Sequence, residues 1–228
     1  MPRQRAQADE QMDDPALPEA IYVDVLHDLA RVNSVTLARR PTLNFLARLP
    51  RQPQPLRILD VGFGDGDMLR SIAHWARARG MAVALTGVDL NPRSTVAAAA
   101  RTPDDLQIRY LTGDYATLAG EQWDVILSSL VAHHMRPAEL TAFLQFMEAQ
   151  AARGWFINDL HRHGFAWLGY PLLARLAGWH RIVREDGQLS IARSYRPAEW
   201  PPLLATAGIT GARVFRAFPF RLCVEKIR

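Results

Sequence analysis

The spacing of hydrophobic and polar positions changes along the chain, and each change marks an element. Between residues 20 and 49, apolar residues recur at near-helical spacing, which predicts two amphipathic helices before a proline-rich linker. From residue 56 onward, short apolar runs alternate with helical patterns. We predict strands at 56–62, 82–90, 106–114, 123–130 and 154–160, and helices at 67–79, 92–101 and 137–152.

This alternation indicates βαβ units, and hence an α/β fold with a mostly parallel sheet and helices on both faces. It stops near the end of the chain, where a helix at 197–207 precedes two strands that meet at Pro219 and predict an antiparallel hairpin. The first fifteen or so residues are polar and acidic, as is typical of a mobile tail. We therefore predict a single domain, with a tail and helical lid at 1–55, the main body at 56–228, and a helical insertion at 161–196.

Composition narrows the class of protein. With 228 residues and 49% hydrophobic content, the chain can bury one sizeable core. It has no apolar run of about 20 residues and no signal-peptide core, so we expect a cytoplasmic protein without stable membrane insertion. The arginines are scattered and form no basic run, which argues against a nucleic-acid partner. The one cysteine, Cys223, lies between apolar residues and is predicted to be a buried strand thiol.

A glycine-rich segment, ILDVGFGDGDML at 58–69, joins the first predicted strand to the first helix of the sheet. Such a loop lets the backbone approach a ligand closely and points helix N–H groups at it. The dinucleotide fingerprint would need glycine at position 67, where this chain has Asp67, and an acidic side chain beside a pyrophosphate is unfavourable. Asp89, which closes the second strand, is suited to hydrogen bonds from ribose hydroxyls. The pattern therefore predicts an adenosine ligand without a pyrophosphate.

Four segments in this order, LDVGFGDG, GVDLN, GDY and WDVILSSLVAHHM, resemble the motifs of class I S-adenosylmethionine-dependent methyltransferases over about residues 56–160. The resemblance implies a Rossmann-like fold with a seven-stranded sheet, with S-adenosyl-L-methionine as cofactor and S-adenosylhomocysteine as product. It places the glycines beside methionine and ribose, Asp60 near the amino group, Asp89 on the ribose, and Leu130 at the methionine end. The cofactor-binding residues that it implies are Asp60, Gly62, Gly64, Gly66, Asp89, Leu90, Asp114, Tyr115 and Leu130.

Histidines gather after the fourth and fifth predicted strands, at the sheet end where the methyl group would lie. VAHHM places His133 and His134 there, and INDLHRHGF adds Asp159, His161 and His163. A hydroxyl acceptor is protonated at neutral pH, and histidine has a suitable pKa for removing that proton. We therefore predict catalytic roles for His133, His134 and His161. We predict no metal, because adjacent histidines rarely face one ion and no fixed ligand spacing is present.

WFINDLHRHGFAWLG and GQLSIARSYRPAEW are similar to small-molecule methyltransferases associated with type III polyketide synthases. This resemblance implies secondary metabolism and O-methylation of a small phenolic or polyketide-derived aromatic acceptor. The aromatic insertion at 161–196 is a candidate roof for the acceptor pocket. Two alternatives stay open: C-methylation of a quinol-like ring, and a cofactor-binding subunit without catalysis. Whether the protein is a homodimer is also open.

Overall fold

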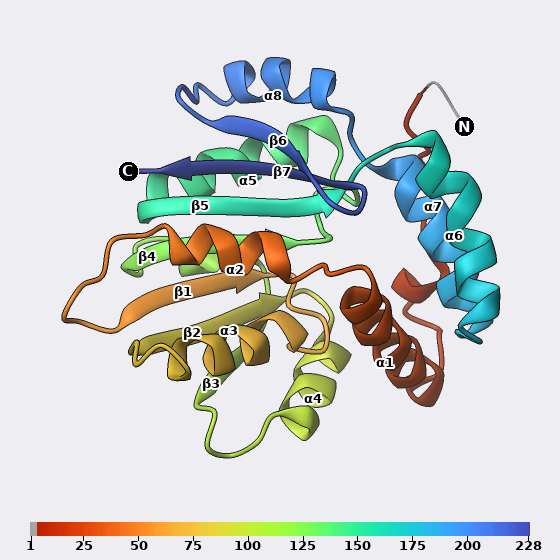
Figure 1. The fold of residues 1–228 in the computed structure, drawn as a ribbon, viewed down its shortest axis with the longest axis horizontal. Coiled ribbons are helices and arrows are strands. Elements are labelled where there is room, and N and C mark those ends of the chain that lie inside the picture. Colours follow the sequence, from red (N-terminus) through yellow and green to blue (C-terminus); the bar gives the residue numbers. More distant parts are fainter. Residues whose placement is uncertain (1–3) are drawn as a thin grey trace.

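A computed structural model describes residues 4–228 of the protein. Its centre is a seven-stranded sheet in the order β3-β2-β1-β4-β5-β7-β6 (Figure 1). Neighbouring strands from β3 to β5 pair in parallel, whereas β7 pairs antiparallel with both β5 and β6. The strands are β1 (Leu56–Val61), β2 (Val83–Asp89), β3 (Ile108–Thr112), β4 (Trp123–Ser129), β5 (Ala151–Leu160), β6 (Arg213–Ala217) and β7 (Arg221–Ile227).

Helices cover both faces of this sheet, and a third group lies beyond its edge. The helices α2 (Arg40–Ala47), α3 (Asp67–Arg77) and α4 (Pro92–Arg101) lie on one face, and α5 (Pro137–Gln150) and α8 (Trp200–Thr206) on the other. Figure 1 shows α1 (Glu19–Val35), α6 (Gly164–Leu176) and α7 (Arg181–Arg193) beyond the ends to which the parallel strands point. Short 3-10 turns occur at η1 (Gln11–Asp13), η2 (Tyr115–Leu118) and η3 (Pro197–Glu199).

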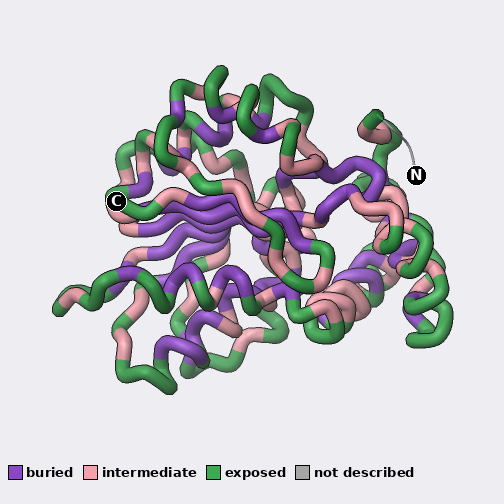
Figure 2. Tube along the Cα trace, turned by 45° about the horizontal axis from the view of Figure 1, so that its top comes forward, coloured by how far each residue is buried: buried purple, intermediate pink, exposed green. Residues whose placement is uncertain are grey.

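Alternating side chains of the strands build one apolar core on each face of the sheet. Ile58 of β1 belongs to the core that includes α2 and α3, whereas the next residue, Leu59, belongs to the core with α5 and α8. Both side chains are fully buried, and Figure 2 shows the strands as the buried centre of the molecule. Because successive residues of a strand point to opposite faces, a fully apolar strand supplies both layers at once.

The predicted fold class is confirmed. The two helices before the linker, the alternating strands and helices, and the terminal hairpin all form. Strand β5 begins at Ala151, three residues before its predicted start, and its pairing with β4 is irregular between Trp123 and Val125. Cys223 lies fully buried in β7, as predicted, and its thiol donates to Asn158 Oδ1 at 3.9 Å.

Within the predicted mobile tail, residues from position 4 onward contact the main body of the protein. The guanidinium of Arg5 donates to the backbone carbonyl oxygens of Arg193, His133 and Met135, at 2.5, 3.0 and 3.1 Å. The side chain of Glu10 is buried against α7, where it accepts a 2.7 Å hydrogen bond from Ser190 Oγ. The charged groups of this polar segment thus have partners on the main body of the protein. Residues 1–3 of the predicted tail lie outside the described residues.

Across residues 4–228, no helix is both long enough and apolar enough to cross a membrane.

Candidate active site

The glycine loop follows β1 and is packed tightly against its neighbours. Gly62 and Gly66 have φ values of +75° and +77°, a region that side chains other than glycine rarely adopt. A Cβ atom on Gly62 would lie 2.3 Å from a methyl group of Val131, and one on Gly66 would lie 2.4 Å from the hydroxyl oxygen of Tyr110. Conformation and space therefore both require glycine at these two positions.

A cavity of about 1080 Å³ opens beside this loop, at the carboxyl ends of the strands. Ligands of open α/β sheets bind at this edge, and typical small-molecule pockets measure about 300–1,000 Å³. The volume is thus sufficient for a cofactor and a second molecule. Eight of the nine predicted cofactor residues line the cavity: Asp60, Gly62, Gly64, Asp89, Leu90, Asp114, Tyr115 and Leu130. Gly66, the ninth, is not among the lining residues.

Two carboxylates mark the part of the cavity on the β2 and β3 side. Asp89 accepts backbone hydrogen bonds from Gly64 at 3.0 Å and from Asn91 at 2.9 Å, which fix the direction of its carboxylate. Asp114 is exposed and accepts the backbone N–H of Ala116 at 2.9 Å, so it also caps a 3-10 turn. Leu90 follows Asp89 and is 76% exposed. The exposed apolar side chain of Leu90 could pack against a flat ring, and the carboxylates of Asp89 and Asp114 could accept hydrogen bonds from groups on such a ligand.

Asp60 lies at the base of the cavity and lacks a compensating charge. Its side chain is 1% exposed, and no hydrogen-bond partner for Oδ1 is found among the described residues. Burial, together with the charges of Asp89 and Asp67, raises the pKa of Asp60 to about 8. A buried carboxyl in this state is suited to receive a cationic group of a ligand.

His133, which lines the cavity, forms a buried pair with Asp159. The Nδ1 atom of His133 is 2.7 Å from Asp159 Oδ1, and the backbone N–H of His133 donates to Oδ2 at 2.7 Å. Burial alone lowers the pKa of His133, but the charges of Asp159 and Glu10 and their hydrogen bonds outweigh it and raise the pKa to about 9. The pair fixes the orientation of the ring and leaves Nε2 directed away from Asp159.

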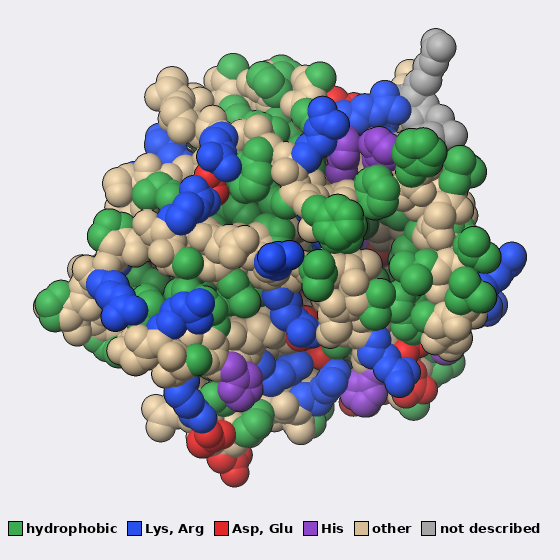
Figure 3. Space-filling view, in the orientation of Figure 1, with side chains coloured by type: hydrophobic (Ala, Val, Ile, Leu, Met, Phe, Trp, Pro, Cys, Tyr) green, Lys and Arg blue, Asp and Glu red, His purple; other side chains and the backbone are tan. Residues whose placement is uncertain are grey.

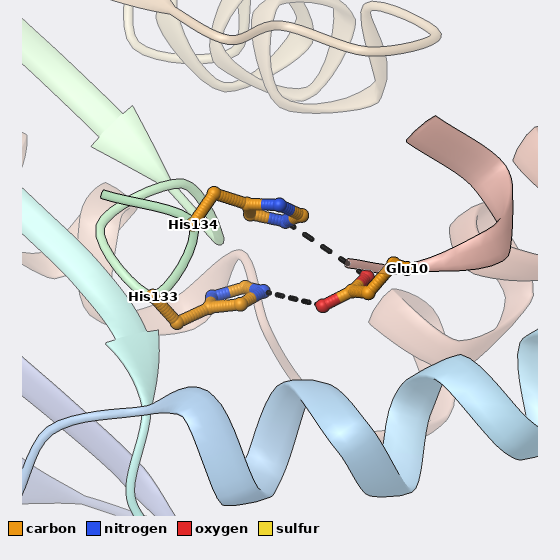
Figure 4. A group of neighbouring side chains, drawn as sticks. All are labelled: Glu10, His133 and His134. Carbon is orange, nitrogen blue, oxygen red and sulfur yellow. Dashed lines mark ion pairs between the residues drawn. The ribbon is translucent and has the colours of Figure 1, made fainter. Parts of the chain in front are cut away.

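Glu10 and His134 complete this group of side chains. Figure 4 shows both histidines, from the loop after β4, turned toward the carboxylate of Glu10 on the N-terminal segment. The Nε2 atoms of His133 and His134 lie 3.6 and 3.9 Å from the two oxygens of Glu10. Burial raises the pKa of Glu10, but the two histidines and Ser190 outweigh it and bring the pKa to about 2. Glu10 is therefore an anion at neutral pH.

Comparison with known proteins identifies the domain that contains this cavity. Residues 58–154, which include the glycine loop, Asp89 and the two histidines, match the family described as "Methyltransferase domain". This part of the chain is therefore similar to a methyltransferase domain. The cofactor of this family is S-adenosylmethionine, in agreement with a glycine loop that is followed by an acidic residue instead of the third fingerprint glycine.

Solved structures with the same fold are also methyltransferases. The magnesium protoporphyrin IX methyltransferase from Synechocystis PCC 6803, with bound SAH, has a TM-score of 0.57 at 17% identity over 96% of this chain and 91% of that one. Human N-acetylserotonin methyltransferase, in complex with SAM, has a TM-score of 0.65 at 14% identity over 96% and 62%. The CMeT domain of the citrinin polyketide synthase has a TM-score of 0.57 at 14% identity over 80% and 48%. At these identities the likeness establishes the fold. No curated protein is similar enough in sequence to count as a relative.

Apolar side chains from three helices form part of the cavity wall. They come from α1, α6 and α7 and include Leu26, Leu29, Phe165, Tyr170 and Leu173. Figure 3 shows hydrophobic side chains gathered over the region of α6, where Phe165, Leu168, Leu172 and Leu176 are exposed. The insertion thus contributes directly to the wall of the cavity.

Of the three histidines that we predicted to be catalytic, His161 is the one that does not lie with His133 and His134 beside Glu10. It lies outside the residues that line the cavity, and its ring packs 5.3 Å from that of His163. Its backbone N–H donates to Phe220, which continues the pairing of β5 with β7. Burial, followed by the charges of His163, Arg216 and Arg196, lowers the pKa of His161 to about 4.

The sequence pattern did not single out Glu10 as a site residue, because it lies 123 positions before His133 in a segment with the composition of a mobile tail. Asp159 was noted only for its position after a strand. Its contact with His133 follows from the parallel pairing of β4 with β5.

Proposed function

We propose that this methyltransferase transfers the methyl group of S-adenosylmethionine to a hydroxyl group of a small phenolic or polyketide-derived acceptor. The observation that carries this proposal is the His133–Asp159 pair, whose histidine lines the same cavity as eight of the nine predicted cofactor residues. The apolar walls from α1, α6 and α7 support an aromatic acceptor. The comparison proteins that are named for an N-acetylserotonin substrate and for a polyketide synthase add support for a small-molecule acceptor.

The cofactor residues have separate tasks. Asp60 would receive the ammonium group of the methionine part, and Asp89 the ribose hydroxyls. Leu90, Asp114 and Tyr115 would surround the adenine, with Leu130 near the methionine end. The bound sulfonium supplies an activated methyl group with a good leaving group. The contribution of the protein is therefore mainly to align the acceptor oxygen with that methyl and to exclude water.

His133 is the proposed general base. As the new bond between the acceptor oxygen and the methyl carbon forms and the bond between sulfur and that carbon breaks, the hydroxyl proton passes to Nε2 of His133. Asp159 holds Nδ1 and stabilises the imidazolium that results. Glu10 lies 3.6 Å from the same Nε2, so the acceptor hydroxyl must take the place of the Glu10 carboxylate. His134 lines the same part of the cavity and would contact the acceptor.

The test is an assay with phenols, resorcinols and quinols, in which products are identified by the mass of one added methyl group and by its position. We expect His133→Ala to lower kcat about 10²- to 10⁴-fold, the usual contribution of a general base, with unchanged affinity for S-adenosylhomocysteine. Asp89→Ala should instead weaken cofactor binding. His74→Ala, at an exposed position on α3, is the matched control.

Three outcomes would contradict the proposal. Full turnover by a variant that lacks both His133 and His134 would exclude a histidine base. A methyl group on ring carbon would identify a C-methyltransferase of quinol-like rings. Cofactor binding without turnover on any acceptor would favour a non-catalytic subunit.

A further inference from the structure

Glu10, His133 and His134 bring three potential metal ligands together at one point of the cavity wall. One ligand atom from each residue lies within 4.8 Å of the others. Adjacent histidines usually point apart, but here the backbone turns after β4, with the N–H of His134 bonded to the carbonyl of Val131 at 2.9 Å. The two imidazole rings consequently lie 4.3 Å apart and face the same carboxylate (Figure 4).

Each histidine is oriented by a second carboxylate on its other ring nitrogen. Nδ1 of His133 is 2.7 Å from Asp159, and Nδ1 of His134 is 3.1 Å from Asp13. Histidines that bind metal ions nearly always give the remaining ring N–H to such a partner, which fixes the tautomer and makes the ligating nitrogen more basic. Both Nε2 atoms are thus positioned as ligands, and Ser190 orients Glu10 through a 2.7 Å hydrogen bond.

The spacing of these atoms suits a shared cation better than direct hydrogen bonds. The separations of 3.6 and 3.9 Å between the Nε2 atoms and the oxygens of Glu10 exceed the range of an N–H to oxygen hydrogen bond. Two ligands at about 2.0–2.1 Å from a tetrahedral zinc ion lie roughly 3.3–3.4 Å apart. Small side-chain movements would therefore bring the three atoms to ligand distance.

The surrounding charge is also compatible with a divalent cation. Three carboxylates, those of Glu10, Asp13 and Asp159, surround the two histidines. Two positively charged side chains lie nearby. The guanidinium of Arg193 lies 3.9 Å from Glu10, but it donates hydrogen bonds to the backbone carbonyls of Ala8 and His134. Arg5 donates to backbone carbonyls as well. The three carboxylates outnumber these two guanidiniums.

We propose that Glu10, His133 and His134 form a binding site for a divalent transition-metal ion, with zinc the best match. Two imidazoles and one glutamate form a donor set that zinc accepts in sites with an open fourth position. All three residues line the cavity, and the open fourth position of the ion would therefore face the cavity.

Metal binding has a consequence for the proposed reaction. Nε2 of His133 has one lone pair, which can bind either the ion or the proton of the acceptor. We therefore expect zinc to inhibit methyl transfer and a chelator to restore it. This consequence rests on the proposed function, whereas the metal site itself does not.

The experiment is calorimetric titration of zinc chloride into chelator-treated protein that carries no histidine tag. We expect one zinc ion per chain, with His134→Ala and Glu10→Gln each weakening binding at least about tenfold, the scale on which lost metal-site contacts act. His74→Ala should bind zinc as the unmodified protein does. Unchanged binding of S-adenosylhomocysteine by each variant would show that it is folded.

The absence of zinc binding by the unmodified protein would overturn the proposal, as would equal zinc affinity in all the variants. If His133→Ala also weakens zinc binding but zinc leaves the turnover of the unmodified protein unaffected, the metal site stands and His133 is excluded as the base. If zinc does not bind and His133→Ala still abolishes turnover, the proposed function stands and the metal site fails.

Discussion

Two buried carboxylates, one that lines the cavity and one that contacts His133, show how neighbours set the charge of a single residue. Asp60 and Asp159 are 1% and 3% exposed. Burial raises the pKa of both, but Asp159 has His133 beside it and two backbone N–H groups, which bring its pKa below the usual value. Asp60 has other carboxylates nearby, and its pKa rises to about 8. Asp159 is therefore an anion at neutral pH, whereas Asp60 can lose its proton when a cation binds beside it.

Cofactor binding should release a proton from Asp60. With a pKa of about 8, the free Asp60 is mostly protonated at neutral pH, and an ammonium group beside it would lower that pKa. We expect release of nearly one proton per bound S-adenosylhomocysteine at neutral pH and none well above pH 8, measured by calorimetry in buffers of different ionisation enthalpy. Asp60→Asn should abolish the release and weaken binding about 10- to 100-fold, the scale of a hydrogen bond to a charged group. Unchanged release in this variant would rule out Asp60 as the source.

Turnover should depend on the ionisation of His133. A base must be deprotonated, and the pKa of His133 is about 9, so kcat/KM should rise with pH and level off near that value. Glu10→Gln removes one of the anions that raise this pKa, and the midpoint of the profile should move to lower pH. The measurement is a pH–rate profile for the unmodified protein and for Glu10→Gln. An identical midpoint in both would show that Glu10 does not control the base.

At the scale of elements, the α6–α7 pair forms one wall of the cavity through close helix contact. Gly187 of α7 faces the ring of Tyr170 on α6, whose hydroxyl donates to the carbonyl of Val183 at 2.8 Å. A Cβ atom on Gly187 would lie 2.3 Å from three atoms of Tyr170. The absence of a side chain at this position is thus what allows the two helices to approach.

Gly187→Ala should therefore destabilise the protein although alanine favours helices. We expect a loss of about 1–3 kcal/mol in the free energy of unfolding, the usual cost of overpacking, measured by urea denaturation. Gly169→Ala in α6 is the matched control, because a Cβ there has no atom within 4 Å. The control should be neutral or more stable by up to about 1 kcal/mol. Equal effects of the two substitutions would contradict the packing argument.

At the scale of the whole molecule, the cavity lies between the sheet edge, the N-terminal segment and the insertion. Its residues come from positions as far apart as Glu10 and Arg221. A ligand that fills it contacts parts of the chain that are distant in sequence, so binding should stabilise the folded protein as a unit.

S-adenosylhomocysteine should raise the melting temperature and NAD should not. At a ligand concentration about 100 times Kd, the expected stabilisation is about 2.7 kcal/mol. For a domain of this size that corresponds to a rise of roughly 5–10 °C in Tm. The check is thermal unfolding with each ligand in parallel. A shift with NAD alone would mean that the glycine loop binds a different cofactor.

The sequence by itself determined the order of the helices and strands, the fold class and the resemblance to methyltransferases. The strand pattern at 56–61, the glycines after it and Asp89 are local signals, since strand and turn there depend on residues near one another in the chain. The same holds for the histidines after β4, whose place at the sheet edge follows from the alternation of strands and helices.

Only the tertiary structure decided which polar groups meet. It brings Glu10 and Asp13 to the histidines, turns His133 and His134 toward one carboxylate, and leaves His161 outside the cavity. The contacts of the N-terminal segment with α7 were equally hidden, because a polar segment has no hydrophobic period to reveal its partner. Contacts between charged groups far apart in sequence depend on the packing of the whole chain, and local patterns do not encode it.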